Sequence, residues 1–433
     1  MQQRAAPAAA TPPGWTCLSD VAVAAHPMSN WLLQMGFDLW IGLCYHREVV
    51  MPENFALAPG SLIASNHQRD VDGPMLGNIL ARRRGLRFEG TPPFYATRED
   101  LFRPGILSRL TVHWPAPLSA LLGKISLAWF FPLGRTEPMR RVREFTLGET
   151  LRALVDAGLG ESDCSTLLNA RGQRELAAGH ASLVDCLARA KPAALERWWG
   201  LRRIKVHALE AIAPAFRAAV EMQLAHFARR LDRGCSVYFS PEGTISMDGH
   251  FCRVRAGFFR LVHLTTKPTW IQPMALGYDT LGPGRSRVIV RIGERFRADA
   301  SLDRRAFDTA LRGTILELVP VTPSHLLARW LVHGPRAFTR DDLTAWMERA
   351  HAALRTVHPS IDPLFARAGV RAIVAARLRW LERKDLIVRR GDAYENISPR
   401  DAPPGWRTPA GVARYLDNYL ADLVPAVDRV LPC

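Results

Sequence analysis

Between about residues 60 and 295, short apolar runs of strand length alternate with longer stretches of helical pattern. Near-continuous apolar runs separated by helices are typical of strands that are buried on both faces of a sheet. The sequence therefore predicts an α/β domain, built on a mixed sheet with helices covering both faces. The predicted strands are residues 61–65, 127–133, 236–240, 270–276 and 287–292.

A long helical block, residues 140–233, interrupts these strands and is predicted to be an insertion. Its last helix carries one apolar stripe, because large apolar residues recur at spacings of three and four between Leu209 and Leu231. Gly234 supplies a stop signal for this helix. Pro214 is expected to kink the first turn or to mark the true start of the helix.

Beyond about residue 300 the pattern is mostly helical, so residues 301–433 are predicted to form a mainly helical C-terminal domain. Thr339 is a predicted N-cap, with Asp342 three residues later. Farther on, an arginine-rich helix at 371–384 precedes a short apolar run and the turn at Gly391. Helix and hairpin together have the outline of a winged helix.

The amino-acid composition excludes some classes of protein and favours certain binding partners. A hydrophobic content of 48% with 23% charged residues excludes a globally disordered chain. The net charge of +16 favours anionic partners such as nucleic acid, acidic phospholipid headgroups or phosphorylated substrates. The seven cysteines are scattered and form no CxxC pair, which indicates free thiols and argues against a structural zinc site.

Two segments approach the character of membrane helices, residues 28–44 and 118–133. Both are shorter than the roughly 20 apolar residues needed to cross a bilayer. Each is therefore either a helix packed in the core or an interfacial helix in the headgroup region. Residues 1–25 lack the apolar segment of a signal peptide and are expected to be a disordered lead.

The first candidate for chemistry is a histidine that follows the first predicted strand. Asn66 and His67 come directly after residues 61–65, and a helix is predicted to begin at Asp72. If the turn leads straight into that helix, Asp72 reaches back to Nδ1 of His67, fixes its tautomer and leaves Nε2 free as a base. The alternative is an incidental histidine in a surface turn.

Three further clusters follow or interrupt predicted strands. Arg135 comes just after residues 127–133, the sequence Pro241-Glu242-Gly243-Thr244 follows 236–240, and Pro273 lies inside 270–276. Open α/β sheets bind ligands at the carboxyl ends of their strands, so these clusters predict one shared cleft. Individually, each also fits an ordinary structural role: a solvated strand end, a turn and an edge marker.

The order of these blocks resembles that of the glycerolipid acyltransferase family, which includes lysophosphatidate and glycerol-3-phosphate acyltransferases. The blocks are NHxxxxD, an aromatic and Pro-Leu-x-Arg strand end, PEGT and a proline-bearing strand, over about residues 60–280. The resemblance implies an acyltransferase domain over residues 26–300. It also implies an enzyme, an O-acyltransferase of phospholipid synthesis. The expected acceptor is a glycerol-phosphate-type alcohol, either 1-acylglycerol 3-phosphate or glycerol 3-phosphate.

The resemblance assigns roles to residues of the four blocks. It implies that His67 is the base and that Asp72 orients it, while Arg135 holds the phosphate of the acceptor. The residues expected to shape the acceptor site are Glu242, Gly243 and Thr244. The acyl group would come from acyl-CoA or acyl carrier protein as co-substrate, and no cofactor or metal is expected.

Two departures from the family pattern bear on the identity of the acceptor. Arg69 stands where a small polar residue is usual, two positions after the histidine. Ile245 stands where many members have a basic residue after Glu-Gly-Thr. A loose resemblance of the last 60 or so residues to larger glycerol-3-phosphate acyltransferases favours glycerol 3-phosphate or another unusual alcohol.

A nucleic-acid-binding protein is the alternative, with the hairpin at 386–395 as its wing and the arginine-rich helix against phosphate. A non-catalytic protein that keeps the fold is a third reading, disfavoured by the intact His67 and Asp72. The positive charge, however, is spread along the chain, partly beside tryptophans, as at 197–203. We therefore expect an anionic membrane surface as partner and no nucleic acid. The expected location is the cytoplasmic face of a membrane, peripheral or monotopic.

Overall fold

The chain divides into two compact units, and each is described separately. The first contains residues 96–228 and the second contains residues 27–95 and 229–433. Residues 301–433 therefore share a unit with most of the sheet, and residues 26–300 are divided between the units. The computed structural model describes residues 27–53, 55–80, 83–84, 87–88, 92–102, 130–140, 145–176, 180–195, 200–298, 301 and 303–433. The predicted lead at 1–25 lies outside these residues.

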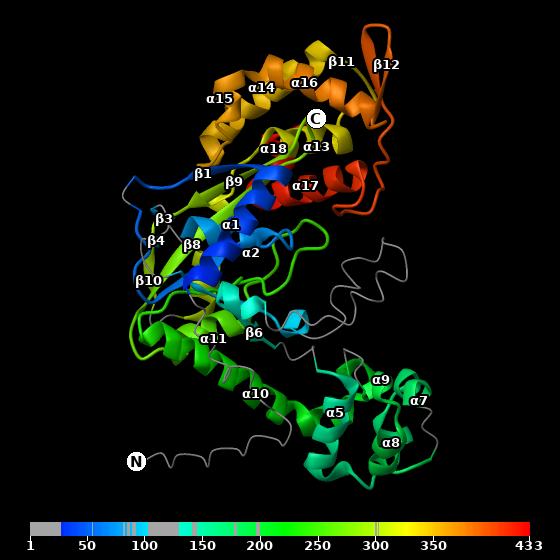
Figure 1. Ribbon diagram of the computed structural model, residues 1–433. Coiled ribbons are helices and arrows are strands. Elements are labelled where there is room, and N and C mark those ends of the chain that lie inside the picture. The colour runs from blue at the N-terminus through cyan, green and yellow to red at the C-terminus, as the bar shows by residue number, and fades with distance from the viewer. Residues whose placement is uncertain are drawn as a thin grey trace. The chain divides into compact units, whose positions relative to one another are not determined.

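The predicted α/β class is confirmed by a mixed sheet of eight strands with helices around it (Figure 1). The strand order is β1-β9-β8-β2-β7-β5-β6, and β10 pairs with β8. The strands are β1 (Tyr45–Val50), β2 (Ser61–Ser65), β5 (Phe94–Arg98), β6 (Thr136–Met139), β7 (Val237–Tyr238), β8 (Thr269–Asp279), β9 (Ser286–Ile292) and β10 (Phe296–Ala298). A separate two-stranded hairpin joins β3 (Arg83–Arg84) and β4 (Arg87–Phe88).

Strand direction determines which loops meet. Strand β2 runs parallel to both neighbours, with Leu62 opposite Val237 of β7 and Ala64 opposite Pro273 of β8. Strand β8 is antiparallel to β9, which in turn runs parallel to β1. Because β2 and β7 are parallel neighbours, the loops that follow them leave the same edge of the sheet. Those loops carry His67 and Glu242.

Four of the five predicted strands are confirmed in position, whereas residues 127–133 are wrong over their described part. Phe131–Gly134 is a 3₁₀-helix, η3, and the strand β6 begins only after Arg135. Pro132 explains the difference, because it has no amide hydrogen for a sheet ladder and its fixed φ suits a tight turn. The amide of Arg135 bonds to the Pro132 carbonyl at 2.9 Å, and Arg135 has a left-handed φ of 56°.

Both faces of the sheet in the second unit are covered. On one face, Met274 and Tyr278 of β8 pack into a core with side chains of α1 (Pro27–Cys44) and α2 (Asp72–Leu80). On the other, Gly277 lies so close to Pro320 that an added Cβ would come within 2.6 Å of the proline ring. Alternate residues of β8 thus point to opposite cores, as the near-continuous apolar run predicts.

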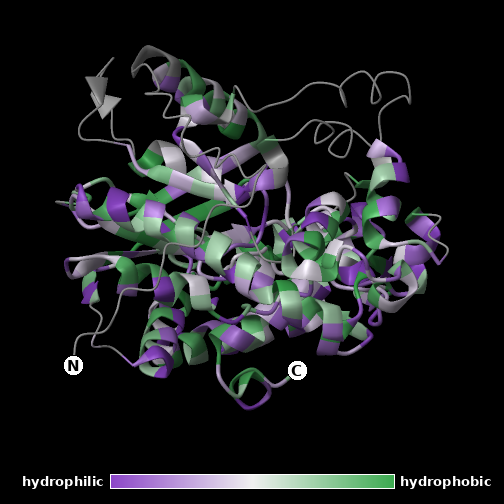
Figure 2. Cartoon of the chain, turned by 90° about the horizontal axis from the view of Figure 1, so that it is seen from below, coloured by the Kyte–Doolittle hydropathy of each residue, from purple (hydrophilic) through white to green (hydrophobic). Residues whose placement is uncertain are grey.

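The remaining helices of the second unit follow the sheet strands or lie between them. They are α11 (Ala256–Leu264), α12 (Arg304–Leu318), α13 (Pro323–His333), α14 (Arg340–Val357), α15 (Leu364–Ala368), α16 (Val370–Arg383), α17 (Pro409–Leu423) and α18 (Val427–Val430). Most helices show both hydrophilic and hydrophobic residues along their length (Figure 2). That mixture is expected where one side of a helix packs and the other faces water.

The C-terminal predictions of a capped helix and a hairpin are confirmed. Thr339 caps α14 and forms a capping box with Asp342. Strands β12 (Ile387–Arg390) and β13 (Ala393–Asn396) form the hairpin, with Gly391 at a φ of 65° in its turn. A third strand, β11 (Ala337–Thr339), pairs with β13 and gives the order β11-β13-β12.

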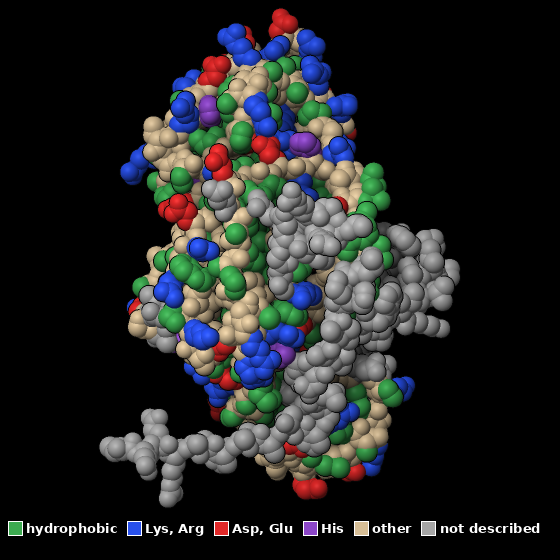
Figure 3. Space-filling view, turned by 60° about the vertical axis from the view of Figure 1, so that its left-hand side comes forward, with side chains coloured by type: hydrophobic (Ala, Val, Ile, Leu, Met, Phe, Trp, Pro, Cys, Tyr) green, Lys and Arg blue, Asp and Glu red, His purple; other side chains and the backbone are tan. Residues whose placement is uncertain are grey.

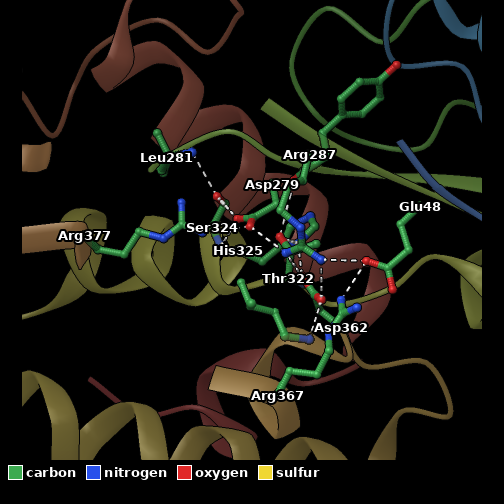
Figure 4. A network of polar contacts seen from close by, with 12 residues as sticks. Glu48, Asp279, Leu281, Arg287, Thr322, Ser324, His325, Asp362, Arg367 and Arg377 are labelled. Atoms are coloured by element: carbon green, nitrogen blue, oxygen red, sulfur yellow. Dashed lines mark hydrogen bonds and ion pairs between the residues drawn. The ribbon is translucent and has the colours of Figure 1, made fainter. Parts of the chain in front are cut away.

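A buried ionic network ties the C-terminal helices to the sheet (Figure 4). Asp279, at the end of β8, accepts hydrogen bonds from Arg377 of α16 at 2.7 Å and from Arg287 of β9 at 3.1 Å. Arg287 also pairs with Asp362 at 2.9 Å. Burial alone would raise the pKa of Asp279, but the charges of the two arginines hold it below its usual value. The carboxylate is therefore ionised and fully paired.

The first unit is mainly helical, which confirms the predicted helical block. Its elements are η2 (Glu99–Phe102), η3 and β6, then α5 (Leu147–Leu154), the π-helix η5 (Val155–Leu159), α6 (Cys164–Leu167), α7 (Ala170–Leu176), α8 (Leu183–Arg189), α9 (Pro192–Leu195) and η6 (Gly200–Arg203). The long helix α10 (Val206–Asp232) begins in this unit. It passes through Pro214, so the alternative that Pro214 marks its start is wrong, whereas the predicted stop at Gly234 is confirmed by a φ of 82°.

Candidate active site

The predicted contact between His67 and Asp72 is present. Nδ1 of His67 lies 3.0 Å from Oδ2 of Asp72, which is the first residue of α2 and is completely buried. The same oxygen accepts the backbone N–H groups of Gln68 at 2.7 Å and Arg69 at 2.9 Å. Three donors on one oxygen fix the carboxylate, and the carboxylate fixes the orientation of the imidazole.

A tyrosine that sequence reasoning missed holds the other oxygen of Asp72. The hydroxyl of Tyr278, on β8, donates to Oδ1 of Asp72. Burial and the nearby carboxylate raise the pKa of Tyr278 well above its usual value, so the hydroxyl stays protonated as a donor. The two residues are 206 positions apart, and no local pattern in the sequence could have indicated the pairing.

The environment of His67 leaves one ring nitrogen available. Its side chain is 24% exposed, and Nε2 has no hydrogen-bond partner among the residues that the structure describes. Burial lowers the pKa of His67, but the hydrogen bond and charge of Asp72 more than offset this, and the net pKa lies above the ordinary 6.5. The imidazole is therefore oriented at Nδ1 and accessible at Nε2.

Glu242 of the PEGT block supports the backbone of His67. One carboxylate oxygen accepts the N–H of His67 at 2.7 Å, and the other accepts the N–H of Cys252 at 2.8 Å. Burial raises the pKa of Glu242 to about 7, although both backbone donors oppose the rise. The amide of Ser246 adds a bond to the His67 carbonyl at 3.3 Å. Both backbone polar groups of His67 are thus held by the loop after β7.

Gly243 and Thr244 form the turn that follows Glu242. Gly243 has a φ of 62°, a left-handed conformation that favours glycine, and its amide bonds to the Ser240 carbonyl at 3.0 Å. The hydroxyl of Thr244 lies 3.4 Å from the carbonyl of Ile245. The structure therefore places these two predicted site residues in the loop that carries Glu242.

Asn66 connects the histidine loop to the sheet and to the C-terminal helices. Its amide oxygen accepts the N–H of Leu276 at 2.8 Å, and its amide nitrogen donates to the carbonyl of Leu276 at 2.8 Å. The same nitrogen donates to the hydroxyl of Tyr419 on α17 at 2.9 Å. An asparagine that is completely buried with these partners is a positioning residue for its neighbour His67.

Pro273 lies inside the sheet and not at its edge. Strand β8 pairs with β10 through residues 269–271 and with β9 from Met274 onward, so Pro273 falls where β8 changes partner. Its missing amide hydrogen therefore costs no ladder bond on that side. The carbonyl of Pro273 still accepts the amide of Gly293 at 3.0 Å.

The structure thus brings together His67, Asp72, Glu242, Gly243 and Thr244 in the second unit. Arg135 belongs to the first unit, between η3 and β6, and its contact with the acceptor stays a prediction. Within the described parts of the chain, no group of three His, Cys, Asp or Glu residues is arranged to hold a metal ion. An imidazole bound at Nδ1 by a carboxylate, with Nε2 free of described partners, can act chemically as a general base.

Comparison with known proteins gives no family assignment. No family model matches the chain, and no curated protein matches it either. The resemblance to glycerolipid acyltransferases consequently rests on the order of the four sequence blocks.

Proposed function

We propose that the protein is an O-acyltransferase that moves a fatty acyl group from a thioester to the hydroxyl of a glycerol-phosphate-type acceptor. The observation that supports this best is the His67 imidazole, held at Nδ1 by Asp72 at 3.0 Å and unpartnered at Nε2 among the described residues. An alcohol is too weak an acid to attack a thioester at a useful rate unless a base removes its proton.

In the proposed reaction, Nε2 of His67 accepts the proton of the acceptor hydroxyl while the oxygen attacks the thioester carbonyl carbon. The tetrahedral intermediate collapses, the carbon–sulfur bond breaks, and the leaving thiolate takes the proton from the imidazolium. The products are an ester and a free thiol, so no enzyme nucleophile and no oxidant are required. Asp72 stabilises the imidazolium that forms between the two proton transfers.

The residues of the other sequence blocks have supporting roles in the proposed reaction. The carboxylate of Glu242 accepts the backbone N–H groups of His67 and Cys252 and so fixes the backbone of the proposed base. In this proposal Gly243 and Thr244 shape the acceptor site through their loop, and Arg135 holds the acceptor phosphate. The donor is acyl-CoA or acyl carrier protein.

The direct test is transfer of a labelled acyl group by wild-type protein and by His67→Ala. Loss of the base is expected to lower the rate by about 10²- to 10⁴-fold without unfolding the protein. His180→Ala is a matched control, because Nδ1 of His180 also lies 3.0 Å from an aspartate, Asp163, but the side chain is 89% exposed. Wild-type turnover in His67→Ala would contradict the proposal.

We also propose that the protein acts at an anionic membrane surface. None of the described helices is long and apolar enough to cross a bilayer. Helix α1, however, exposes an apolar stripe at helical spacing, with Leu32, Leu39 and Leu43 exposed to 58%, 68% and 67%. Such a stripe suits the interface of a membrane, and the net charge of +16 favours acidic headgroups.

Vesicle flotation tests the membrane proposal. The double variant Leu39→Glu/Leu43→Glu is expected to lose flotation with anionic vesicles. Val184→Glu/Val206→Glu adds the same charge at two exposed valines outside α1 and serves as the control. Equal flotation of both variants and wild type would contradict a role for α1.

Nucleic-acid binding is the second candidate, favoured by the strand order β11-β13-β12 beside α14 and α16. In the C-terminal part at the top of Figure 3, Lys and Arg side chains are prominent. Arg389 and Arg390 of the hairpin are exposed. This candidate predicts salt-sensitive retention of DNA or RNA that is lost in Arg389→Ala/Arg390→Ala. Equal binding to heparin, anionic vesicles and DNA would reduce it to a nonspecific effect of charge.

A further inference from the structure

The side chain of Arg69 lies among three aromatic rings beside the candidate active site. Its guanidinium carbon is 4.2 Å from the ring centroid of Trp406, 5.2 Å from that of Tyr278 and 6.0 Å from that of Tyr45. Arg287 and Arg377 of the same unit are paired with carboxylates. The side chain of Arg69, in contrast, forms neither an ion pair nor a hydrogen bond with any residue that the structure describes.

An aromatic platform holds a guanidinium without using its hydrogen-bond donors. The attraction is between the cation and the face of the ring, whereas the five N–H groups lie in the plane of the guanidinium. The rings come from β1, β8 and the segment before α17, so three distant parts of the fold restrict one side chain. Arg69 is thereby ordered in advance, and its planar fork matches the geometry of a phosphate.

The same supports hold Arg69 and the proposed base. The backbone N–H of Arg69 donates to Oδ2 of Asp72 at 2.9 Å, and that oxygen lies 3.0 Å from Nδ1 of His67. Tyr278 contributes twice, with its hydroxyl on Asp72 and its ring near the guanidinium. The backbone of Arg69 and the imidazole of His67 are therefore held by the same carboxylate, and Tyr278 contacts both that carboxylate and the guanidinium.

We propose that Arg69 binds a phosphate monoester of the substrate and so selects a phosphorylated acceptor. This inference rests on the acyl transfer proposed above and names a residue that recognises its phosphorylated acceptor. Phosphate could reach Arg69 from the acceptor or from the coenzyme A part of the donor. Arg69 lies on the loop of the base, which acts on the acceptor hydroxyl. For this reason we assign the acceptor's phosphate to Arg69, as a contact additional to the one proposed for Arg135.

The test compares Arg69→Met with wild type on four substrate pairs. Glycerol 3-phosphate and glycerol are the acceptors, and acyl-CoA and the phosphate-free S-acyl-N-acetylcysteamine are the donors. We expect the preference for glycerol 3-phosphate over glycerol, as a ratio of kcat/KM values, to fall about 10- to 100-fold with either donor. Arg349→Met, at an exposed position of α14, is the matched control and is expected to keep the wild-type ratio.

Two results would overturn the inference. One is an unchanged acceptor ratio in Arg69→Met. The other is a fall in kcat/KM that appears only with acyl-CoA and is equal for both acceptors. That result would assign Arg69 to the donor. Should Arg69→Met fail to fold, Trp406→Leu keeps the charge, removes the nearest ring and is expected to lower the ratio by a smaller factor. An unchanged ratio in folded Trp406→Leu would then contradict the proposed platform.

Calorimetry of glycerol 3-phosphate binding separates this inference from the proposed function. If wild type binds glycerol 3-phosphate about 10- to 100-fold more tightly than Arg69→Met but transfers no acyl group, the acyltransferase proposal fails and the Arg69 site stands. If acyl transfer occurs and Arg69→Met binds like wild type, the Arg69 site fails and the acyltransferase proposal stands.

Discussion

The amide nitrogen of Asn66 donates to the hydroxyl of Tyr419 at 2.9 Å, although the two residues are 353 positions apart. Asn66 is the neighbour of the proposed base, and Tyr419 lies on the C-terminal helix α17. The contact shows that the C-terminal residues form part of the cluster that holds His67. They are not an appendage to a domain that is complete without them.

Because of this contact, we expect substitutions of Asn66 and Tyr419 to lower the free energy of unfolding by different amounts. Tyr419→Phe removes one hydrogen bond and is expected to lower the free energy of unfolding by about 1 kcal/mol. Asn66→Ala also leaves both backbone groups of Leu276 without their partner and is expected to cost about 2–5 kcal/mol. Urea unfolding measures both, with Tyr394→Phe in the hairpin as a control near zero. Equal costs for Asn66→Ala and Tyr419→Phe would contradict this account of Asn66.

The raised pKa of His67 predicts how activity depends on pH. Only the neutral imidazole acts as a base, so log(kcat/KM) should rise with pH and level off above a midpoint that is higher than 6.5. Asp72→Asn removes the charge that raises this pKa. The midpoint should therefore move to lower pH, while the plateau falls about 10²-fold.

The exposed pair at His180 supplies the control for this pH profile. Asp163→Asn removes the carboxylate from that pair and should leave the profile of acyl transfer unchanged. A midpoint in Asp72→Asn that is equal to or higher than that of wild type would show that Asp72 does not stabilise the His67 imidazolium.

Glu242 is predicted to act through the backbone that it binds. Glu242→Ala leaves the N–H groups of His67 and Cys252 without their acceptor and is expected to cost about 2–5 kcal/mol of stability and to lower kcat. Glu242→Gln keeps one acceptor oxygen and should fall between wild type and Glu242→Ala. Chemical unfolding and steady-state kinetics measure the order of the three proteins, and a reversed order would contradict a supporting role.

The Asp279 network predicts that one arginine of α16 matters for stability and another does not. Arg377→Met leaves a fully buried carboxylate short of a partner and should cost about 3–5 kcal/mol. Arg379→Met, on an exposed position of the same helix, should change stability by less than about 0.5 kcal/mol. Thermal or urea unfolding of the two variants is the measurement. Similar values for both would show that the network does not stabilise the fold.

The sequence predicts best those features that depend on residues close together in the chain. Strand β2 and the pairing of His67 with Asp72 depend on residues no more than five positions apart, and both are found. The residues 127–133 misled because their apolar character suggested a strand, whereas Pro132 and a tight turn decide the conformation of the described part. Sequence pattern also missed β1 and β5, whose alternation of apolar and polar residues is weak.

The supports of the site could not be predicted, since each depends on a contact between distant parts of the chain. Glu242 was expected to shape the acceptor site, but its bond to the backbone of His67 spans 175 positions. Tyr278 lies five residues after Pro273 on β8 and Trp406 lies before α17, at positions that none of the four blocks specifies. Arg69 was visible only as a departure from the family pattern, and the aromatic rings around it became apparent in the fold.

The central claim, that His67 is the base of an acyl transfer, is tested most directly by one measurement. Purified wild-type protein and His67→Ala are incubated with labelled acyl-CoA and an acceptor panel of glycerol 3-phosphate, lysophosphatidate, other lysophospholipids and non-phosphorylated alcohols. We predict that wild type forms a labelled ester with a phosphorylated acceptor and that His67→Ala is slower by about 10²- to 10⁴-fold. Ester formation at the same rate by both proteins, or none with any acceptor, would contradict the account.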